Sequence, residues 1–165
     1  MAKMTRNDLL PEVVEYLASG PLPGVIGGQK VPSANKKTFT TCDPGSRETL
    51  AEVYAMQPAD VDRAVQAAQE AFAKSGWPQL SPNDRGVLLH RLADAVEQRK
   101  KIFAQIEALD CGKVYAQAEA DVQNFVDTTR YFTNMALHIQ HRSPLAAARH
   151  EAWTARAPWG ACGFI

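Results

Sequence analysis

The chain has 165 residues, of which 45% are hydrophobic and 22% are charged, and this composition is that of an ordinary globular protein with one modest domain. Lys and Arg together number 18, as do Asp and Glu, so no basic excess favours nucleic acid or an anionic membrane as a partner. The first residues lack the apolar core of a signal peptide, and no apolar run approaches the roughly 18 residues of a membrane span. The three cysteines are widely spaced, as is usual for reduced thiols. These features together favour a cytoplasmic protein.

The first third of the chain alternates between turn signals and short apolar runs. Residues 7–19 have apolar residues at helical spacing and predict a short helix, although Pro11 obscures where it starts. Residues 24–31 predict a hairpin that turns at two glycines, and residues 38–41 and 49–54 predict two more strands on either side of a turn signal. This spacing favours a small antiparallel β unit.

Long helical patterns follow the β unit. A first helix is expected to open at Pro58 and to end at Gly76, with apolar residues at every third or fourth position between them. A last helix with the same spacing is expected from about residue 114 to about residue 139. Helices of this kind cannot bury their apolar stripes alone, so we expect them to pack against one another.

The middle helical pattern organises the chain. Ser81 is expected to be its N-cap, with Pro82 at the first helical position. The run Arg99-Lys100-Lys101 interrupts the apolar stripe and predicts a break or a bend, and Gly112 is suited to close the helix. On this pattern we expect two large side chains of the stripe, Leu92 and Phe103, to be core residues.

The last residues are expected to be extended. Ser143-Pro144 breaks the helical pattern, residues 151–156 predict a strand, and residues 161–165 predict the start of a buried strand. The chain therefore divides into an N-terminal helix and linker (1–23), a β unit (24–56), a helical region (57–140) and extended strands (141–165).

Several stretches carry a specific pattern. Residues 61–72 read Val-Asp-Arg-Ala-Val-x-Ala-Ala-x-x-Ala-Phe, residues 80–94 contain Leu-Ser-Pro-x-x-Arg-Gly-x-Leu-Leu-x-Arg-Leu-Ala-Asp, and residues 107–113 read Glu-Ala-Leu-Asp-Cys-Gly-Lys. In this order they resemble the N-terminal helices of the aldehyde dehydrogenase superfamily. Residues 43–48 stand where that family has an Asn-Pro-x-Thr-Gly-Glu turn. Residues 157–165 resemble the segment that enters its cofactor domain, with alanine in place of the usual acid at the first position.

The resemblance implies an α+β fragment, with long packed helices and a small antiparallel β unit, that is part of an aldehyde dehydrogenase-like α/β fold. It implies that the complete enzyme oxidises an aldehyde to a carboxylic acid with NAD or NADP, through a cysteine-bound hemithioacetal. The family's catalytic cysteine, general-base glutamate and glycine-containing cofactor loop have no counterpart in this chain. The resemblance therefore implies no catalytic residue here, and Ile165 as the only cofactor contact.

The resemblance also bears on partners. It implies that this chain pairs with the remainder of an aldehyde dehydrogenase chain, that the enzyme is a homo-oligomer, and that the chain alone is inactive and binds no cofactor. The alternative is a non-catalytic scaffold or assembly protein derived from the same family.

The residues that could carry chemistry have simpler interpretations. His138 and His141 are three residues apart, but a metal site needs further ligands, so no metal site is expected. A reactive cysteine needs a neighbour that lowers its pKa. Cys111 is expected at a helix C-terminus, Cys162 in a buried strand and Cys42 beside an aspartate, so structural roles are favoured for all three.

Overall fold

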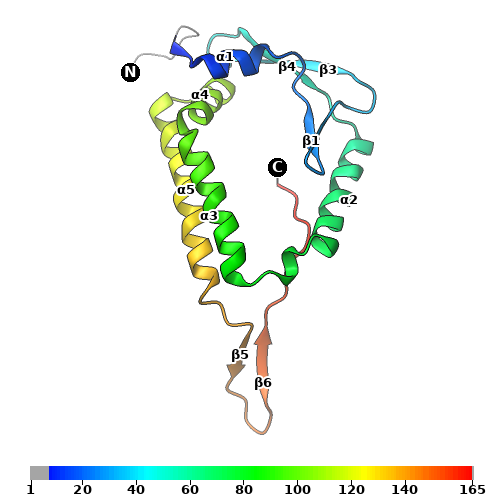
Figure 1. The fold of residues 1–165 in the computed structure, drawn as a ribbon, viewed down its shortest axis with the longest axis vertical. Helices are drawn as coiled ribbons and strands as arrows, with labels where there is room; N and C mark the ends of the chain where they lie inside the picture. The colour runs from blue at the N-terminus through cyan, green and yellow to red at the C-terminus, as the bar shows by residue number, and fades with distance from the viewer. Residues whose placement is uncertain (1–7, 165) are drawn as a thin grey trace.

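The computed structural model describes residues 8–164, which form an open arch of helices and short paired strands (Figure 1). The helices are α1 (Pro11–Ala18), α2 (Pro58–Lys74), α3 (Pro82–Gln98), α4 (Lys100–Cys111) and α5 (Tyr115–Ala136), with a short 3-10 helix η2 (Trp77–Gln79). The strands are β1 (Gly24–Ile26), β2 (Gln29–Val31), β3 (Thr38–Cys42), β4 (Thr49–Tyr54), β5 (Arg142–Leu145) and β6 (Ala152–Ala155). This mixture of helices and small antiparallel sheets is the expected fold class.

The strands form three separate antiparallel pairs, β1–β2, β3–β4 and β5–β6. The first pair turns at Gly27 and Gly28, whose φ angles of 57° and 78° suit the turn that matches the twist of a hairpin. The second pair lies at the top of the arch in Figure 1, and the third projects from its opposite end. The predicted hairpin, the predicted β3–β4 unit and the strand near residues 151–156 are therefore confirmed.

The ends of the helices follow the capping residues. Ser81 Oγ accepts a hydrogen bond from the backbone N–H of Asp84 (3.1 Å), as expected of the N-cap of α3. The helix is interrupted at Arg99, between α3 and α4, so the basic run does end the first helix. Two helices are shorter than predicted. The first begins at Pro11 and not near residue 7, because proline suits the first helical position, and α5 ends at Ala136 and not near residue 139.

Gly112 ends α4 in the left-handed conformation (φ 68°) and also lies against Pro44 of the β3–β4 turn. A Cβ at this position would lie 2.7 Å from Pro44 Cγ. We therefore expect Gly112→Ala to lower the free energy of unfolding by about 2–4 kcal/mol, because left-handed strain and a steric clash add. Urea denaturation measures this change, with Gly163→Ala as the matched control because no heavy atom lies near a Cβ there. Equal midpoints for the two variants would contradict the packing of α4 on the turn.

Small residues make the contact between the helices. The buried cluster consists of Ala104 and Ala108 of α4 and Ala118 of α5. Gly86 and Ala93 of α3 are also buried, and a Cβ on Gly86 would lie 3.4 Å from Thr133 Cγ2 of α5. The helices therefore approach one another closely and bury few large side chains.

Two sequence predictions about burial were wrong. Leu92 is 48% exposed and Phe103 is 44% exposed, because α3 and α4 turn their small residues toward α5 and leave their large ones outside. Residues 161–164 do not form a buried strand. Phe164 is 94% exposed and Cys162 is exposed as well, because no strand within residues 8–164 lies beside this segment to receive its backbone hydrogen bonds.

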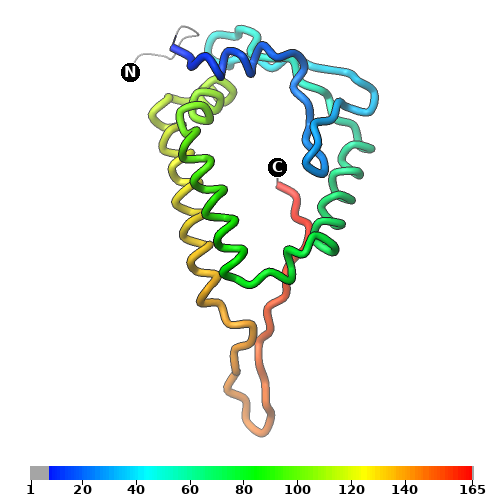
Figure 2. The backbone as a smooth tube through the Cα atoms, viewed as in Figure 1, coloured from blue at the N-terminus to red at the C-terminus, as the bar shows by residue number. Residues whose placement is uncertain are grey.

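The final segment returns along the arch after the β5–β6 hairpin, as the tube in Figure 2 traces. It passes α2, where Phe72 comes within 3.8 Å of a Cβ position on Gly160. Among residues 8–164, none of the helices combines the length and the apolar character needed to cross a membrane.

Candidate functional site

The residues with possible chemistry do not come together. Cys42, Cys111 and Cys162 are free and exposed, and burial of the thiol, together with the Glu107 carboxylate, raises the pKa of Cys111. A raised pKa lowers the fraction of thiolate, which is the nucleophilic form of cysteine. His138 lies just beyond α5, and no group of three or more metal-binding side chains occurs in the described range 8–164. Ile165, the predicted cofactor contact, lies outside the described residues.

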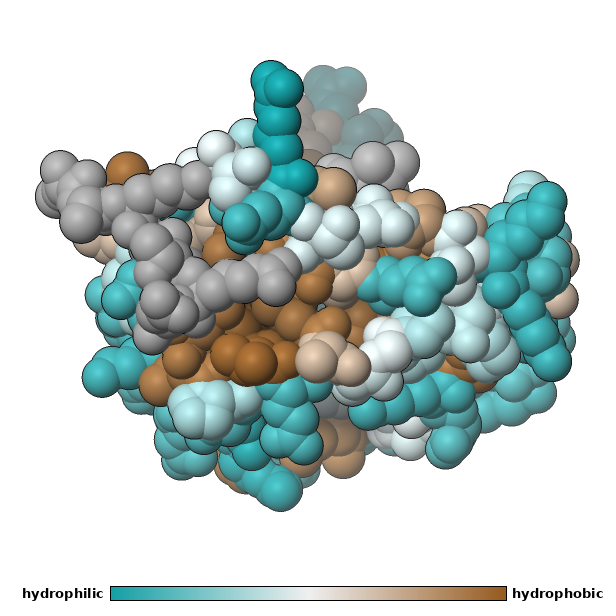
Figure 3. All heavy atoms as spheres, turned by 90° about the horizontal axis from the view of Figure 1, so that it is seen from above, coloured by the Kyte–Doolittle hydropathy of each residue, from teal (hydrophilic) through white to brown (hydrophobic). Residues whose placement is uncertain are grey.

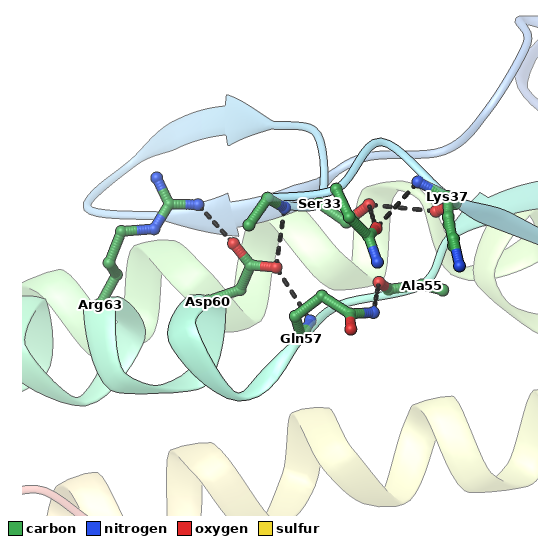
Figure 4. Close-up of polar contacts among 8 residues, drawn as sticks. Ser33, Lys37, Ala55, Gln57, Asp60 and Arg63 are labelled. Atoms are coloured by element: carbon green, nitrogen blue, oxygen red, sulfur yellow. Dashed lines mark hydrogen bonds and ion pairs between the residues drawn. The ribbon is translucent and has the colours of Figure 1, made fainter.

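The most enclosed carboxylate is structural. Asp60 is only 1% exposed and accepts hydrogen bonds from the backbone N–H groups of Gln57 (2.9 Å) and Ala34 (3.0 Å) and from Arg63 (2.6 Å) (Figure 4). The Gln57 bond is the largest of the causes that lower the pKa of Asp60, followed by the Ala34 bond, and burial opposes them. The carboxylate therefore holds the β2–β3 connection against the start of α2.

This network makes a pH-dependent contribution to stability. Because the folded-state pKa of Asp60 is lowered, its contribution is complete above about pH 4 and is lost as the pH falls through the folded-state value. We expect Asp60→Asn to be less stable than the parent at pH 7 and to lose less of its stability between about pH 5 and pH 2. Thermal unfolding across that range measures it, with Asp62→Asn on the exposed side of α2 as the control. Parallel profiles for the parent and Asp60→Asn would contradict this assignment.

One edge of the α3–α5 pair is polar. Arg130 of α5 donates hydrogen bonds to Asp94 (2.6 Å) and Glu97 (2.7 Å) of α3, and His90 lies 3.2 Å from Asn134. The Arg130 guanidinium is the main cause that lowers the pKa of Glu97. These hydrogen bonds and ion pairs join α3 to α5, which run antiparallel.

A second ion-paired group holds the α4–α5 connection. Lys113 Nζ donates to Glu107 (2.6 Å) and to Asp121 (3.0 Å), and the two carboxylates raise the pKa of Lys113. Lys113 is also the main cause that lowers the pKa of Asp121. Glu107 is half-buried, and its carboxylate is ion-paired with Lys113.

The other edge of the helix pair is apolar. Helical spacing places Leu88 and Leu92 on the side of α3 away from the Arg130 cross-links, and Phe125 and Phe132 on the corresponding side of α5. A groove of about 360 Å³ between the helices, lined mainly by apolar side chains, belongs to the same edge. We call this surface the apolar face, and its members are Leu88, Leu92, Val96, Phe103, Ile106, Val122, Phe125 and Phe132.

The apolar face is only part of an unusually large exposed surface. The chain exposes 12310 Å², about 4,200 Å² more than the roughly 8,100 Å² typical of a folded monomer of 18.1 kDa. On α2, Val61, Val65 and Phe72 are exposed as well. An excess of this size is in the range that obligate interfaces bury. The arrangement can therefore bind a large apolar partner, and within residues 8–164 it shows no constellation for catalysis.

This surface is not among the sites predicted from the sequence. The spacing of Leu92 and Phe103 marks an apolar stripe, and on that basis both are predicted to be interior residues. A signal was present, since α3 carries the small residues Gly86 and Ala93 on one side and large apolar residues on another. A helix that is apolar on two sides needs a partner on each of them.

Comparison with known proteins gives consistent matches. The aldehyde dehydrogenase family model matches residues 31–165. Cytosolic 10-formyltetrahydrofolate dehydrogenase of Pongo abelii is 40% identical over 145 residues, which cover 85% of this chain and 16% of that protein. The putative aldehyde dehydrogenase DhaS of Bacillus subtilis (strain 168) is 36% identical over 141 residues, covering 85% of this chain and 28% of that protein.

Solved structures agree with the sequence matches. The aldehyde dehydrogenase from Bacillus cereus in complex with NAD+ is 32% identical, with a TM-score of 0.77 over 86% of this chain and 28% of the other. The expected fold and the expected family resemblance are confirmed by this likeness. The chain spans only 16% to 28% of the length of these relatives.

Proposed function

The chain belongs to the aldehyde dehydrogenase family, and on this premise we propose that it is a supporting, non-catalytic segment of an enzyme that oxidises an aldehyde to a carboxylic acid. The observation that carries the proposal is the apolar face together with about 4,200 Å² of excess exposed surface. The proposed partner is the remainder of an aldehyde dehydrogenase chain, packed on this face.

NAD or NADP is assigned to the complete enzyme. A dinucleotide site of the common kind needs a strand, a glycine-rich loop and a helix N-terminus in succession. In the described part of the chain, β4 leads into α2 through Ala55, Met56 and Gln57, without a glycine. These residues do not fit a dinucleotide, so we derive no step of the reaction from them.

The remaining parts of the proposal rest on the family. A homo-oligomeric enzyme and a cytoplasmic location are both predictions: one relative is named cytosolic and another, from Mus musculus, is named mitochondrial. The alternative, a non-catalytic scaffold or assembly protein derived from the same family, is not favoured, because the relatives described above are named as dehydrogenases.

A chimera tests the proposal. Residues 31–165 replace the matching part of the Bacillus cereus enzyme, and NADH formation is followed with a panel of aldehydes. We expect turnover from the chimera and none from the isolated chain, because the isolated chain has no counterpart of the family's catalytic cysteine and glutamate. A chimera with Leu92→Glu serves as the matched control and should fail to assemble. Turnover by the isolated chain, or a folded but inactive chimera, would overturn the proposal.

A further inference from the structure

A small cavity lies between α1, the β3–β4 pair and α4, and its volume is about 190 Å³. Leucines form much of its lining: Leu17 from α1, Leu22 from the chain after it, Leu50 from β4 and Leu109 from α4. Figure 3 views the molecule from the end where α1 and the β3–β4 pair lie and shows apolar side chains gathered there. Of the residues that line the cavity, Ile106 alone also belongs to the apolar face.

Hydrogen bonds hold the walls of this cavity in place. The buried Gln105 of α4 donates to the carbonyl of Asp8 (3.0 Å) and accepts from the backbone N–H of Leu10 (2.8 Å), just before α1. Across the cavity, Thr41 Oγ1 of β3 donates to Asp110 Oδ1 of α4 (3.2 Å). These bonds attach both α1 and β3 to α4, so the cavity is part of the fold.

The size and the lining of the cavity determine what can fill it. An apolar cavity of about 150 Å³ stays free of water and is large enough to hold benzene. The present cavity is somewhat larger, so it has room for a benzene ring with a short substituent. A ring in this space would also gain the dispersion contacts that the side chains around an empty cavity lack.

A carboxylate lies at the edge of this apolar space. Asp110 is exposed, and within the described residues Thr41 donates to its Oδ1, while its Oδ2 accepts no hydrogen bond. An ionised carboxylate only accepts hydrogen bonds, and a charged donor binds it more strongly than a neutral one. The substituent that fits best is therefore an ammonium. We infer that the cavity binds a small aromatic primary amine, with the ring among the leucines and the ammonium at Asp110.

The groove of the apolar face lacks this combination of features. Its carboxylates, Glu107 and Asp121, are both ion-paired with Lys113 (2.6 Å and 3.0 Å), so a cation already neutralises them. Asp110 has no such ion pair with any residue in the range 8–164. The amine site concerns neither packing on the apolar face nor catalysis, so its test can fail without affecting the proposed function.

Calorimetric titration of the full chain with benzylamine tests the inference. We expect saturable binding with a Kd of about 1 mM or below, which is ordinary for a ligand of this size. Benzyl alcohol has the same ring without the charge and should bind about tenfold more weakly, because hydrogen bonds between charged groups are stronger. Methylamine has the ammonium without the ring and should show no binding in this range.

Substitutions locate the ligand. Asp110→Asn should weaken benzylamine binding by about tenfold and leave benzyl alcohol binding unchanged. Asp121→Asn, the same change at the groove of the apolar face, is the matched control and should alter neither. Val53→Phe places a ring in the cavity and should abolish binding of both aromatic probes. Methyl chemical shifts of Leu50 and Leu109 in the parent chain locate the ring without any substitution.

Three results would overturn the inference. The first is a benzylamine affinity that Asp110→Asn leaves unchanged, and the second is a loss of binding in Asp121→Asn instead. The third is an absence of saturable binding, or binding that leaves the methyl shifts of Leu50 and Leu109 where they are.

Discussion

Light scattering on the isolated chain should give a mass well above 18.1 kDa, because the apolar face is exposed when nothing covers it. Soluble monomers rarely expose contiguous apolar patches of more than a few hundred Å². We expect Leu92→Glu with Phe132→Glu to return most of the chain to the monomer. These two side chains are 48% and 63% exposed, so a charge at either position meets water in the monomer and an apolar neighbour in the aggregate.

The matched control is Val25→Glu. Val25 is 67% exposed but lies on the β1–β2 hairpin, away from the apolar face. This change should leave self-association as it is. A monodisperse monomer at all concentrations would show that the exposed surface does not need a partner.

Truncation of the large apolar side chains should change stability by different amounts in the isolated chain and in the chimera. In the isolated chain at low concentration, Leu92→Ala and Phe103→Ala should each change the free energy of unfolding by less than about 1 kcal/mol, because both side chains are half-exposed. In the chimera with the Bacillus cereus enzyme, the same changes should cost about 2–5 kcal/mol, as for buried residues of this size. Denaturant unfolding measures both.

The comparison between contexts is the informative quantity. Ala93→Gly serves as a reference, because Ala93 is already buried in the chain alone. This substitution should lower the free energy of unfolding by a similar amount in the isolated chain and in the chimera. If Leu92→Ala and Phe103→Ala cost as little in the chimera as in the isolated chain, the apolar face does not receive the remainder of the enzyme.

Local features of the fold could be predicted from the sequence. The hairpin at Gly27 and Gly28, the cap at Ser81 and the helix end at Gly112 each depend on a residue whose own chemistry determines the local backbone. The break at Arg99 follows in the same way from an interrupted apolar stripe.

Burial could not be predicted in the same way. Periodicity shows that Leu92 lies on an apolar stripe, but it does not say which partner covers the stripe. Gly86 and Ala93 determine the contact with α5 because small residues allow the closest approach, and the larger residues are left for another partner. The segment 161–164 shows the same limit, since an apolar strand is stable only where a neighbouring strand pairs with it.

The same distinction between local chemistry and packing applies to the residues of the candidate site. The position of Cys111 at a helix C-terminus could be predicted from the sequence, and the structure adds the carboxylate of Glu107 beside its thiol. Ile165 as a cofactor contact stays a prediction. The ion pairs of Lys113 and Arg130 join residues from different helices, so the sequence could not specify them without the packing.

Side-chain footprinting of the apolar face tests the central claim most directly. Leu92 and Phe103 are labelled with a photoactivated carbene in the dilute isolated chain and in the chimera, with fully buried Val126 as the internal reference. We expect both residues to be labelled far more than Val126 in the isolated chain and to fall to the level of Val126 in the chimera. Labelling of Leu92 and Phe103 that is as strong in an active chimera as in the isolated chain would contradict the claim that this face binds the remainder of the enzyme.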